Sequence, residues 1–184
     1  MGVFSRDSEL VPVTGKRFDQ TALFGATAGW TVLGLETESL ATSAEHIVGT
    51  TSLSFAKVDA APITKAAGIY RAVSWDLTGI GAKDKILAYF HMPDVTLVDY
   101  AFLRIGTDAS HLVEYQMADG DMDDASWNGM ELTVDGYTSQ TGNGIDWSAV
   151  KYLAVGIMFD GEADALAALL WNSFSVEQAQ VTRT

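Results

Sequence analysis

The chain lacks cysteine and has only three prolines among its 184 residues. Without cysteine it can have no disulfide framework, thiolate metal site or cysteine nucleophile. No apolar run approaches the roughly 20 residues that a membrane-spanning helix needs. The opening residues, MGVFSRDSEL, lack the apolar segment of a secretory signal. We therefore expect a protein that is made and kept in a cytoplasm and has no membrane partner.

Basic residues are scarce, with 11 Lys and Arg against 24 Asp and Glu, a formal net charge of −13. Nucleic acid is therefore not an expected partner, because phosphate contacts need clustered basic side chains. The excess of acidic residues is unevenly distributed along the chain. Residues 1–30 carry three basic and three acidic residues (3 − 3 = 0), and residues 31–184 carry the whole excess (8 − 21 = −13). A neutral segment thus precedes an acidic body.

Hydrophobic residues make up 48% of the chain and recur with the alternation typical of β-strands. The expected strands are Trp30–Leu35, Thr51–Val58, Gly68–Leu77, Lys85–Met92, Tyr100–Ile105, Leu112–Met117, Met130–Val134, Val150–Phe159 and Leu166–Val176. Turn residues such as Gly, Asp and Asn separate nearly all of them. Short strands at this spacing predict an all-β fold, a two-sheet antiparallel β-sandwich of jelly-roll type.

Two segments are also compatible with helix. Ala41–Val48 could form a helical turn with Ser43 as its cap. Glu162–Leu170 is rich in Ala and Leu, which favour helix. We nevertheless assign a strand from Leu166 onward, because a helix there would leave the sandwich without its last strand.

Residues 1–29 show neither a helical nor a strand period, and Pro12 and Gly15 interrupt them. We expect an extended N-terminal arm at residues 1–29, followed by the sandwich at residues 30–184. The apolar side chains of the arm must be buried somewhere, since burial of each large one is worth about 1.5–3 kcal/mol. They pack on their own domain or on a neighbouring subunit. For the second case, the expected partner-binding residues are Val3, Phe4, Leu10, Val11 and Phe24.

The order of several short motifs resembles the jelly-roll domains of carbohydrate-binding modules and laminin-G-like domains. The motifs are Val73–Gly79 (VSWDLTG), Leu103–Asp108 (LRIGTD), the following aromatic strand with Tyr115, the pair Trp127-Asn128, and Leu170–Val176 (LWNSFSV). The resemblance covers about residues 30–178 and implies the fold. It carries over no set of ligand-binding residues by position.

Sandwiches with this series of turns also resemble virion proteins of tailed phages. The resemblance implies a non-enzymatic virion structural protein, an accessory capsid decoration or cement subunit that binds neighbouring coat subunits. The expected partners are the major capsid protein or other virion proteins, and a homotrimer is favoured by analogy. Its location would be the virion, after synthesis in the host cytoplasm. The alternative is a carbohydrate-binding module, or a tail or fibre domain, that recognises host glycans.

Catalysis is not expected. The histidines His46, His91 and His111 are far apart in sequence, and the Gly-x-Ser-x-Gly motif of a nucleophile elbow does not occur. A glycosidase needs two carboxylates on either side of the scissile bond. Among 24 acidic residues some pair always fits that requirement, so the sequence offers no evidence for one.

The acidic stretch after residue 118 is the candidate metal site. Asp119, Asp121 and Asp123 alternate along it, and carboxylate oxygens suit Ca²⁺. The EF-hand pattern fails, because Asp124 stands where Gly is required and Met130 stands where Glu is required. We expect no cofactor and a solvated acidic loop here. The alternative is a calcium-binding loop of a kind other than the EF-hand.

Sugar binding needs aromatic side chains beside polar groups on one face. Most tyrosines and tryptophans lie in apolar strands, where a core position is expected. Trp127 is the best exposed candidate, because it follows the acidic loop. If the chain binds glycans, the expected residues are Tyr115, Trp127 and Asn128.

Overall fold

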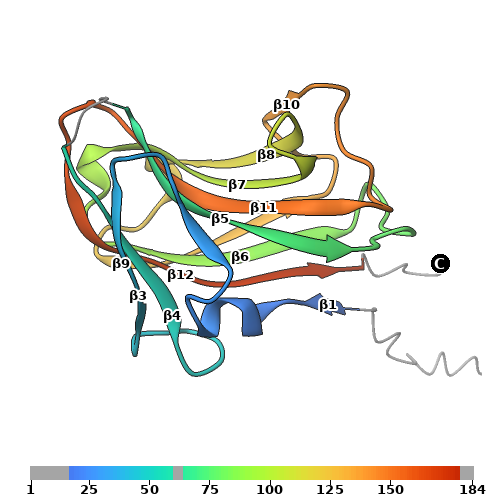
Figure 1. Ribbon diagram of the computed structural model, residues 1–184, viewed down its shortest axis with the longest axis horizontal. Coiled ribbons are helices and arrows are strands. Elements are labelled where there is room, and N and C mark those ends of the chain that lie inside the picture. Colours follow the sequence, from blue (N-terminus) through green and yellow to red (C-terminus); the bar gives the residue numbers. More distant parts are fainter. Residues whose placement is uncertain (1–16, 60–63, 179–184) are drawn as a thin grey trace, which may run out of the picture.

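The computed structural model describes residues 17–59 and 64–178, and within them the chain is almost entirely β-structure (Figure 1). Two antiparallel sheets of six strands each pack face to face, which confirms the predicted jelly-roll sandwich. Sheet I has the order β3-β4-β12-β6-β9, and β1 also pairs with β12. Sheet II has the order β10-β8-β7-β11-β5-β2.

The bounds of the elements are as follows. Sheet I contains β1 (Arg17–Asp19), β3 (Thr37–Ser43), β4 (Ser52–Lys57), β6 (Lys85–Met92), β9 (Ser126–Thr133) and β12 (Leu166–Glu177). Sheet II contains β2 (Trp30–Leu33), β5 (Ala66–Trp75), β7 (Val98–Asp108), β8 (His111–Ala118), β10 (Ser139–Thr141) and β11 (Val150–Phe159). The three short 3-10 helices are η1 (Thr21–Gly25), η2 (Val95–Leu97) and η3 (Asp119–Asp121).

The strands with the strongest apolar patterns match their predictions. Lys85–Met92 is β6, which lies between two neighbours as expected, and Val150–Phe159 is β11. The predicted hairpin is β7–β8, and Asp108 pairs with His111 across its turn. The final segment is strand β12 rather than helix, with the register irregularity of a bulge near Ala168, whose φ is 58°.

The segment Ala41–Val48, which could form a helical turn by its sequence, contains no helix. β3 continues to Ser43 and pairs with β4 at the sheet edge, so its backbone groups are bonded within the ladder. Strand β10 was not predicted either, because its three residues are all exposed. Edge strands need little apolar alternation, since neighbours contact them on one side only.

Aromatic rings from both sheets meet in the core. Trp75 of β5 stacks on Phe174 of β12, with ring centroids 5.5 Å apart and an interplanar angle of 6°. The ring of Phe18 in β1 closes the group, 5.1 Å from Trp75 and edge-on to it. These contacts join the two sheets through their inward faces.

Part of the predicted arm lies within the described residues, and it packs on its own domain. β1 pairs with the end of β12, and η1 follows directly. Phe24, an expected partner-binding residue, is fully buried and lies 5.1 Å from the ring of Trp30. Its side chain is therefore part of this chain's core. Val3, Phe4, Leu10 and Val11 lie outside the described residues.

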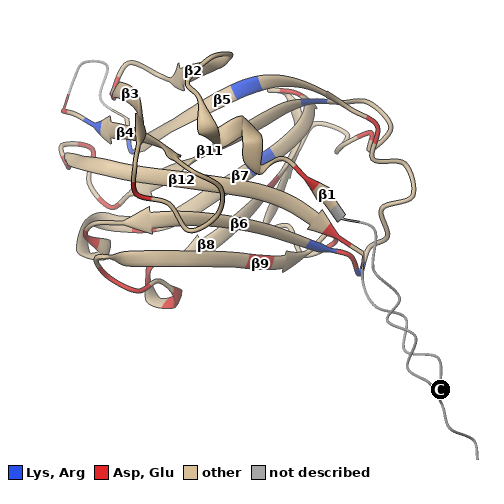
Figure 2. Cartoon of the chain, turned by 90° about the horizontal axis from the view of Figure 1, so that it is seen from below, with Lys and Arg blue, Asp and Glu red and all other residues tan. Residues whose placement is uncertain are grey.

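Acidic positions lie mainly in loops and at strand ends, and the middle of most strands is uncharged (Figure 2). Across residues 17–59 and 64–178 we find no helix with the length and apolar content to span a bilayer.

Candidate functional site

The strand register brings a set of polar and aromatic side chains together on the outward face of sheet II. Alternate residues of β5, β11, β7 and β8 face outward, and the pairing aligns them in rows across the four strands. We call this set the tyrosine face. Its rows are Ala72–Tyr152–Gly106–Leu112, Tyr70–Ala154–Arg104–Glu114, Gly68–Gly156–Phe102–Gln116 and Ala66–Met158–Tyr100–Ala118.

Two glycines form the floor of this face. A Cβ placed on Gly156 would lie 2.4 Å from the tip of the Phe102 ring, and one on Gly68 would lie 3.2 Å from it. The Phe102 ring therefore lies flat over both glycine backbones and is fully buried, although it points away from the sandwich core. Small residues at these two positions are what allow a phenyl ring to lie on the sheet.

The charged part of the face is built on that ring. The Arg104 guanidinium lies 4.1 Å from the centroid of Phe102, a cation–π contact. Its Nε donates to one carboxylate oxygen of Glu114, and the Gln116 amide donates to the other at 2.6 Å. Glu114 is 6% exposed, so this network is held firmly. Among the described residues, the two terminal NH2 groups of Arg104 have no hydrogen-bond partner.

Three half-exposed tyrosines flank the Arg104–Glu114 pair. Tyr70 and Tyr152 stack with ring centroids 5.9 Å apart and an interplanar angle of 24°. Burial, assisted by the nearby Glu114 charge, raises the pKa of Tyr100. Burial likewise raises the pKa of Tyr152. These two hydroxyls therefore stay protonated at neutral pH, where each can both donate and accept a hydrogen bond.

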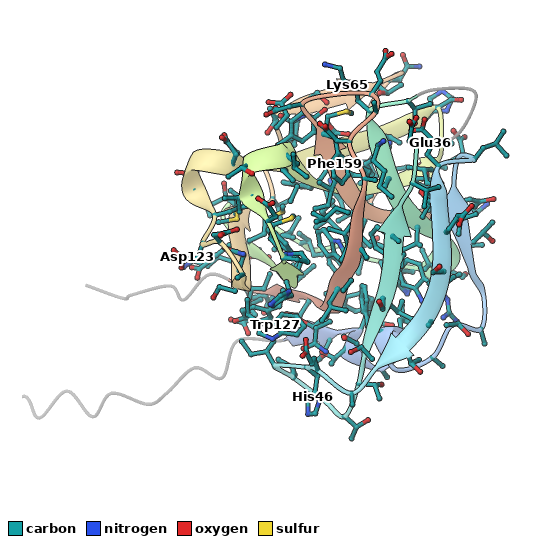
Figure 3. The ribbon with its side chains drawn as sticks, turned by 90° about the vertical axis from the view of Figure 1, so that its left-hand side faces the viewer. Glu36, His46, Lys65, Asp123, Trp127 and Phe159 are labelled. Atoms are coloured by element: carbon teal, nitrogen blue, oxygen red, sulfur yellow. The ribbon has the colours of Figure 1, made fainter. Side chains whose placement is uncertain are left out.

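Trp127, the aromatic residue singled out in the sequence, lies on the other side of the molecule. It faces outward from β9 in sheet I, and its ring meets the edge of His91 at a centroid distance of 5.7 Å. In Figure 3 Trp127 and His46 lie at the lower surface, whereas Lys65 lies at the top. The structure does not bring Trp127 together with the tyrosine face.

The other two predicted glycan contacts are enclosed. Tyr115 is fully buried, and its hydroxyl donates to the carbonyl oxygen of Val134 at 2.7 Å, so its ring offers no surface to a ligand. Asn128 is 4% exposed, and its amide bonds the backbone of Asp123 and Ser126. Asn128 therefore fixes the acidic loop against β9.

The three aspartates of the predicted metal loop are exposed. Asp119 and Asp121 begin and end η3, and Asp123 follows it. Within residues 17–59 and 64–178, no three side chains of His, Cys, Asp or Glu are grouped as metal ligands.

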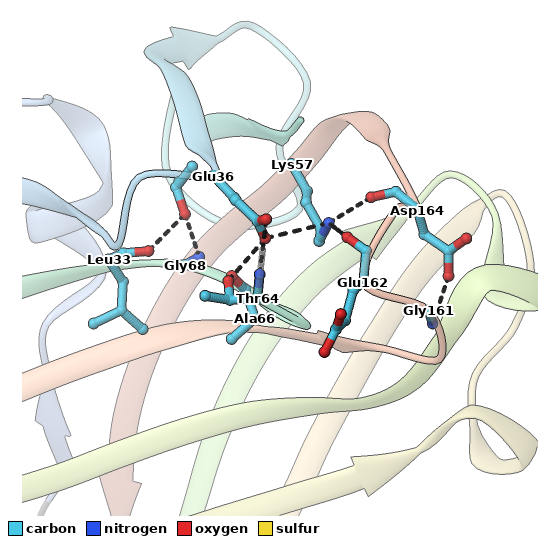
Figure 4. Close-up of polar contacts among 10 residues, drawn as sticks. Leu33, Glu36, Lys57, Thr64, Ala66, Gly68, Gly161, Glu162 and Asp164 are labelled. Atoms are coloured by element: carbon cyan, nitrogen blue, oxygen red, sulfur yellow. Dashed lines mark hydrogen bonds and ion pairs between the residues drawn. The ribbon is translucent and has the colours of Figure 1, made fainter. Parts of the chain in front are cut away.

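A buried ion pair lies at the β3 end of the sandwich (Figure 4). Lys57 and Glu36 are 1% and 0% exposed, and their charged atoms are 3.4 Å apart. The Lys57 ammonium also donates to the carbonyl oxygens of Glu162 and Asp164, at 2.8 and 2.6 Å. Burial opposes ionisation of Glu36, but the bonds from Thr64 and the Lys57 charge lower its pKa. The charges of Lys57 and Glu36 thus have partners within the protein. We therefore interpret this cluster as a structural contact between loops rather than as a ligand-binding site.

The tyrosine face is not predicted from the sequence, because tyrosines in apolar strands are expected to lie in the core. A usable signal was present in β5, where Gly68 and Tyr70 alternate with the core residues Ala67 and Ile69. The companion rings come from strands far away in the sequence. No local pattern could show that Tyr152 lies beside Tyr70.

The sequence matches no family model and no curated protein. Its fold is similar to solved carbohydrate-binding modules. The family 11 module from Clostridium thermocellum, solved in complex with a β-1,3-1,4-mixed-linked tetrasaccharide, has a TM-score of 0.59 at 11% identity, over 90% of this chain and 97% of that one. A family 28 module described as specific for non-crystalline cellulose has a TM-score of 0.53 at 16% identity, over 84% and 91%.

Enzymes that contain such a domain match only in part. An agarase has a TM-score of 0.59 at 9% identity, over 91% of this chain and 25% of the enzyme. Three carbohydrate-binding modules are instead covered over 91–98% of their own length. At these identities the likeness shows the fold alone.

Proposed function

We propose that this protein is a non-catalytic carbohydrate-binding domain, with the tyrosine face as its binding surface. One observation carries the proposal: stacked rings and hydrogen-bonding groups without protein partners share one outward face. Among the described residues, the hydroxyls of Tyr70, Tyr100 and Tyr152 and the outer NH2 groups of Arg104 have no protein hydrogen-bond partner. These groups suit a ligand that is apolar on its ring faces and polar at its edges, as a sugar is.

The proposed ligand is a chain of β-linked sugar units. The face crosses four strands, and neighbouring strands lie about 4.8 Å apart. It therefore offers room for several consecutive rings. The tyrosine rings would pack against the CH-rich faces of the sugars, and Arg104 would donate to their hydroxyls. Glu114 holds Arg104 in place through its own hydrogen bond.

The number and the bonding of the carboxylates on the tyrosine face favour sugar binding over sugar hydrolysis. Glu114 is the only carboxylate in its four rows, and both of its oxygens accept hydrogen bonds from protein groups. Hydrolysis by the usual route needs two carboxylates flanking one glycosidic bond. The chain also covers 97% of the family 11 module and 91% of the family 28 module, which supports a binding function over hydrolysis.

The capsid decoration hypothesis stays a prediction. It depends on an arm of which four expected contact residues lie outside the described part of the chain, and Phe24 is buried in this chain's own core. Neither the predicted trimer nor a capsid partner is addressed by the fold comparisons.

The test is binding to soluble polysaccharides, measured by isothermal titration and by retardation in gels that contain the polymer. The panel includes mixed-linked β-glucan, a soluble cellulose derivative, agarose and starch. We expect one β-linked polymer to bind and Tyr70→Ala/Tyr152→Ala to lose that binding. Trp127→Ala, which removes a half-exposed ring from the other sheet, is the matched control and should bind as the parent does. Equal loss in both variants, or no binding to any polymer, would refute the proposal.

A further inference from the structure

A second candidate site lies away from the tyrosine face, at the end of the sandwich where β9 and β10 meet the loop before β11. A cavity of about 300 Å³ opens there. Its walls include Trp147, Tyr137, Ile145, Gln140, Asn143 and Asp135. Ligand sites in proteins typically have volumes of roughly 300–1,000 Å³. This cavity is at the lower end, the size for one small ring rather than a chain.

The strand register separates this cavity from the tyrosine face. Gln140 of β10 pairs with Val113 of β8, and both residues line the cavity. Their sequence neighbours Ser139 and Glu114 also pair, and they point to the opposite side of the sheet. The cavity and the tyrosine face therefore lie on opposite sides of the same two strands, and one can be altered without the other.

The lining of the cavity is apolar on one part and polar on another. Trp147 and Ile145 supply apolar surface, and Trp147 is fixed because its carbonyl oxygen accepts the backbone N–H of Leu77 at 2.7 Å. Gln140 and Asn143 supply amide groups at the exposed rim. The Gln140 amide lies directly against Gly144, where a Cβ would be 3.1 Å from it. Glycine at position 144, with φ of +84°, thus leaves room for this amide.

The charges at the cavity wall and on the whole chain bear on whether the cavity could hold an acidic ligand. A hydrogen bond from Thr133 and the contact with Lys83 lower the pKa of Asp135, so this wall residue is ionised at neutral pH. Lys83 pairs with this carboxylate at 3.1 Å, so the described residues of the wall carry no free positive charge, and the net charge of −13 disfavours an acidic ligand. Neutral rings that carry hydroxyl groups remain as suitable occupants.

We propose that this end cavity binds a single neutral sugar unit, as a free monosaccharide or as the terminal residue of a glycan. The apolar wall takes one face of the ring. The Gln140 Oε1 accepts from the Tyr137 hydroxyl at 3.3 Å, so the Gln140 NH2 group and the Asn143 amide bond the sugar hydroxyls. The inference goes beyond the proposed function, because this site does not use the tyrosine face.

The test is a set of NMR titrations of the full chain with glucose, galactose, mannose, xylose and glucuronic acid. We expect one neutral sugar to shift the resonances around Trp147 and Asn143, and glucuronic acid to shift none of them. Gln140→Ala should lower the affinity for that sugar about tenfold, the usual effect of losing one or two hydrogen bonds. Thr141→Ala, an exposed neighbour on the same strand, is the matched control and should leave the affinity unchanged.

Tyr70→Ala/Tyr152→Ala separates this inference from the proposed function. The double variant should keep the monosaccharide site even where polysaccharide binding is lost. The inference is overturned if no neutral sugar shifts the cavity resonances. It is also overturned if Gln140→Ala binds as tightly as Thr141→Ala does, or if the double variant loses the monosaccharide.

Discussion

The two outward faces of the sandwich both carry aromatic rings, but among the described residues these rings have different polar surroundings. On sheet II the Tyr70–Tyr152 pair lies beside an Arg104–Glu114 pair that is fixed on a buried phenyl ring. On sheet I Trp127 lies beside His91, whose buried Nδ1 has no hydrogen-bond partner within residues 17–59 and 64–178. The rings of that face come from the edge pair β6–β9. The comparison shows that rings exposed on the same sandwich can differ in the polar groups that surround them.

The largest difference between the faces is expected from glycine substitutions. Gly156→Ala should destabilise the fold by about 1–3 kcal/mol or more, since its Cβ would lie 2.4 Å from the carbonyl oxygen of Ala67. Gly129→Ala on sheet I is the control. Its Cβ would meet only the half-exposed Tyr89 ring, at 3.1 Å, and that ring can move. Thermal unfolding of both variants measures the contrast, and equal melting temperatures would contradict it.

The next largest effect concerns the tyrosines themselves. Single Tyr152→Ala and Tyr70→Ala variants should each weaken polysaccharide binding about 10- to 100-fold, the range expected for central aromatic contacts. Tyr89→Ala on sheet I should leave the affinity unchanged. Titration calorimetry with the best-binding polymer measures all three. A loss with Tyr89→Ala would place the site on sheet I and reverse the comparison.

A smaller effect is expected from the charged pair. Glu114→Gln should lower stability by about 1–3 kcal/mol, because Arg104 and the mostly buried position 114 lose a charge-assisted hydrogen bond. It should also weaken sugar binding through misplacement of Arg104. Glu131→Gln breaks the Lys85–Glu131 pair on sheet I, whose side chains are 51% and 55% exposed. Exposed pairs contribute little, so its urea midpoint should match that of the parent.

The smallest effect is expected from pH. The folded pKa values of Tyr100 and Tyr152 lie above the ordinary value of 10.0, mainly because of burial. Their contribution to stability is therefore fully present below pH 10 and is lost as pH rises through the folded values. Polysaccharide affinity should be constant between about pH 6 and pH 9 and should fall only above about pH 10. A marked change below pH 9 would mean that another group controls the site.

The all-β architecture and most of the strands could be predicted from the sequence. Apolar alternation and turn residues are local signals, so Lys85–Met92 and Val150–Phe159 could be placed to the residue. The N-terminal arm stays partly outside the described residues. The failures lie at the edges, where β3 and β10 have too few buried positions to produce alternation.

Which rings face outward depends on the tertiary structure. Tyr115 and Tyr70 both lie in apolar strands, yet Tyr115 is buried and Tyr70 is half-exposed on the outward face. That difference depends on the register of β5, β7, β8 and β11, because a shift of one residue would turn each side chain to the other face. Register is set by pairing between residues far apart in the chain, and no local sequence pattern records it.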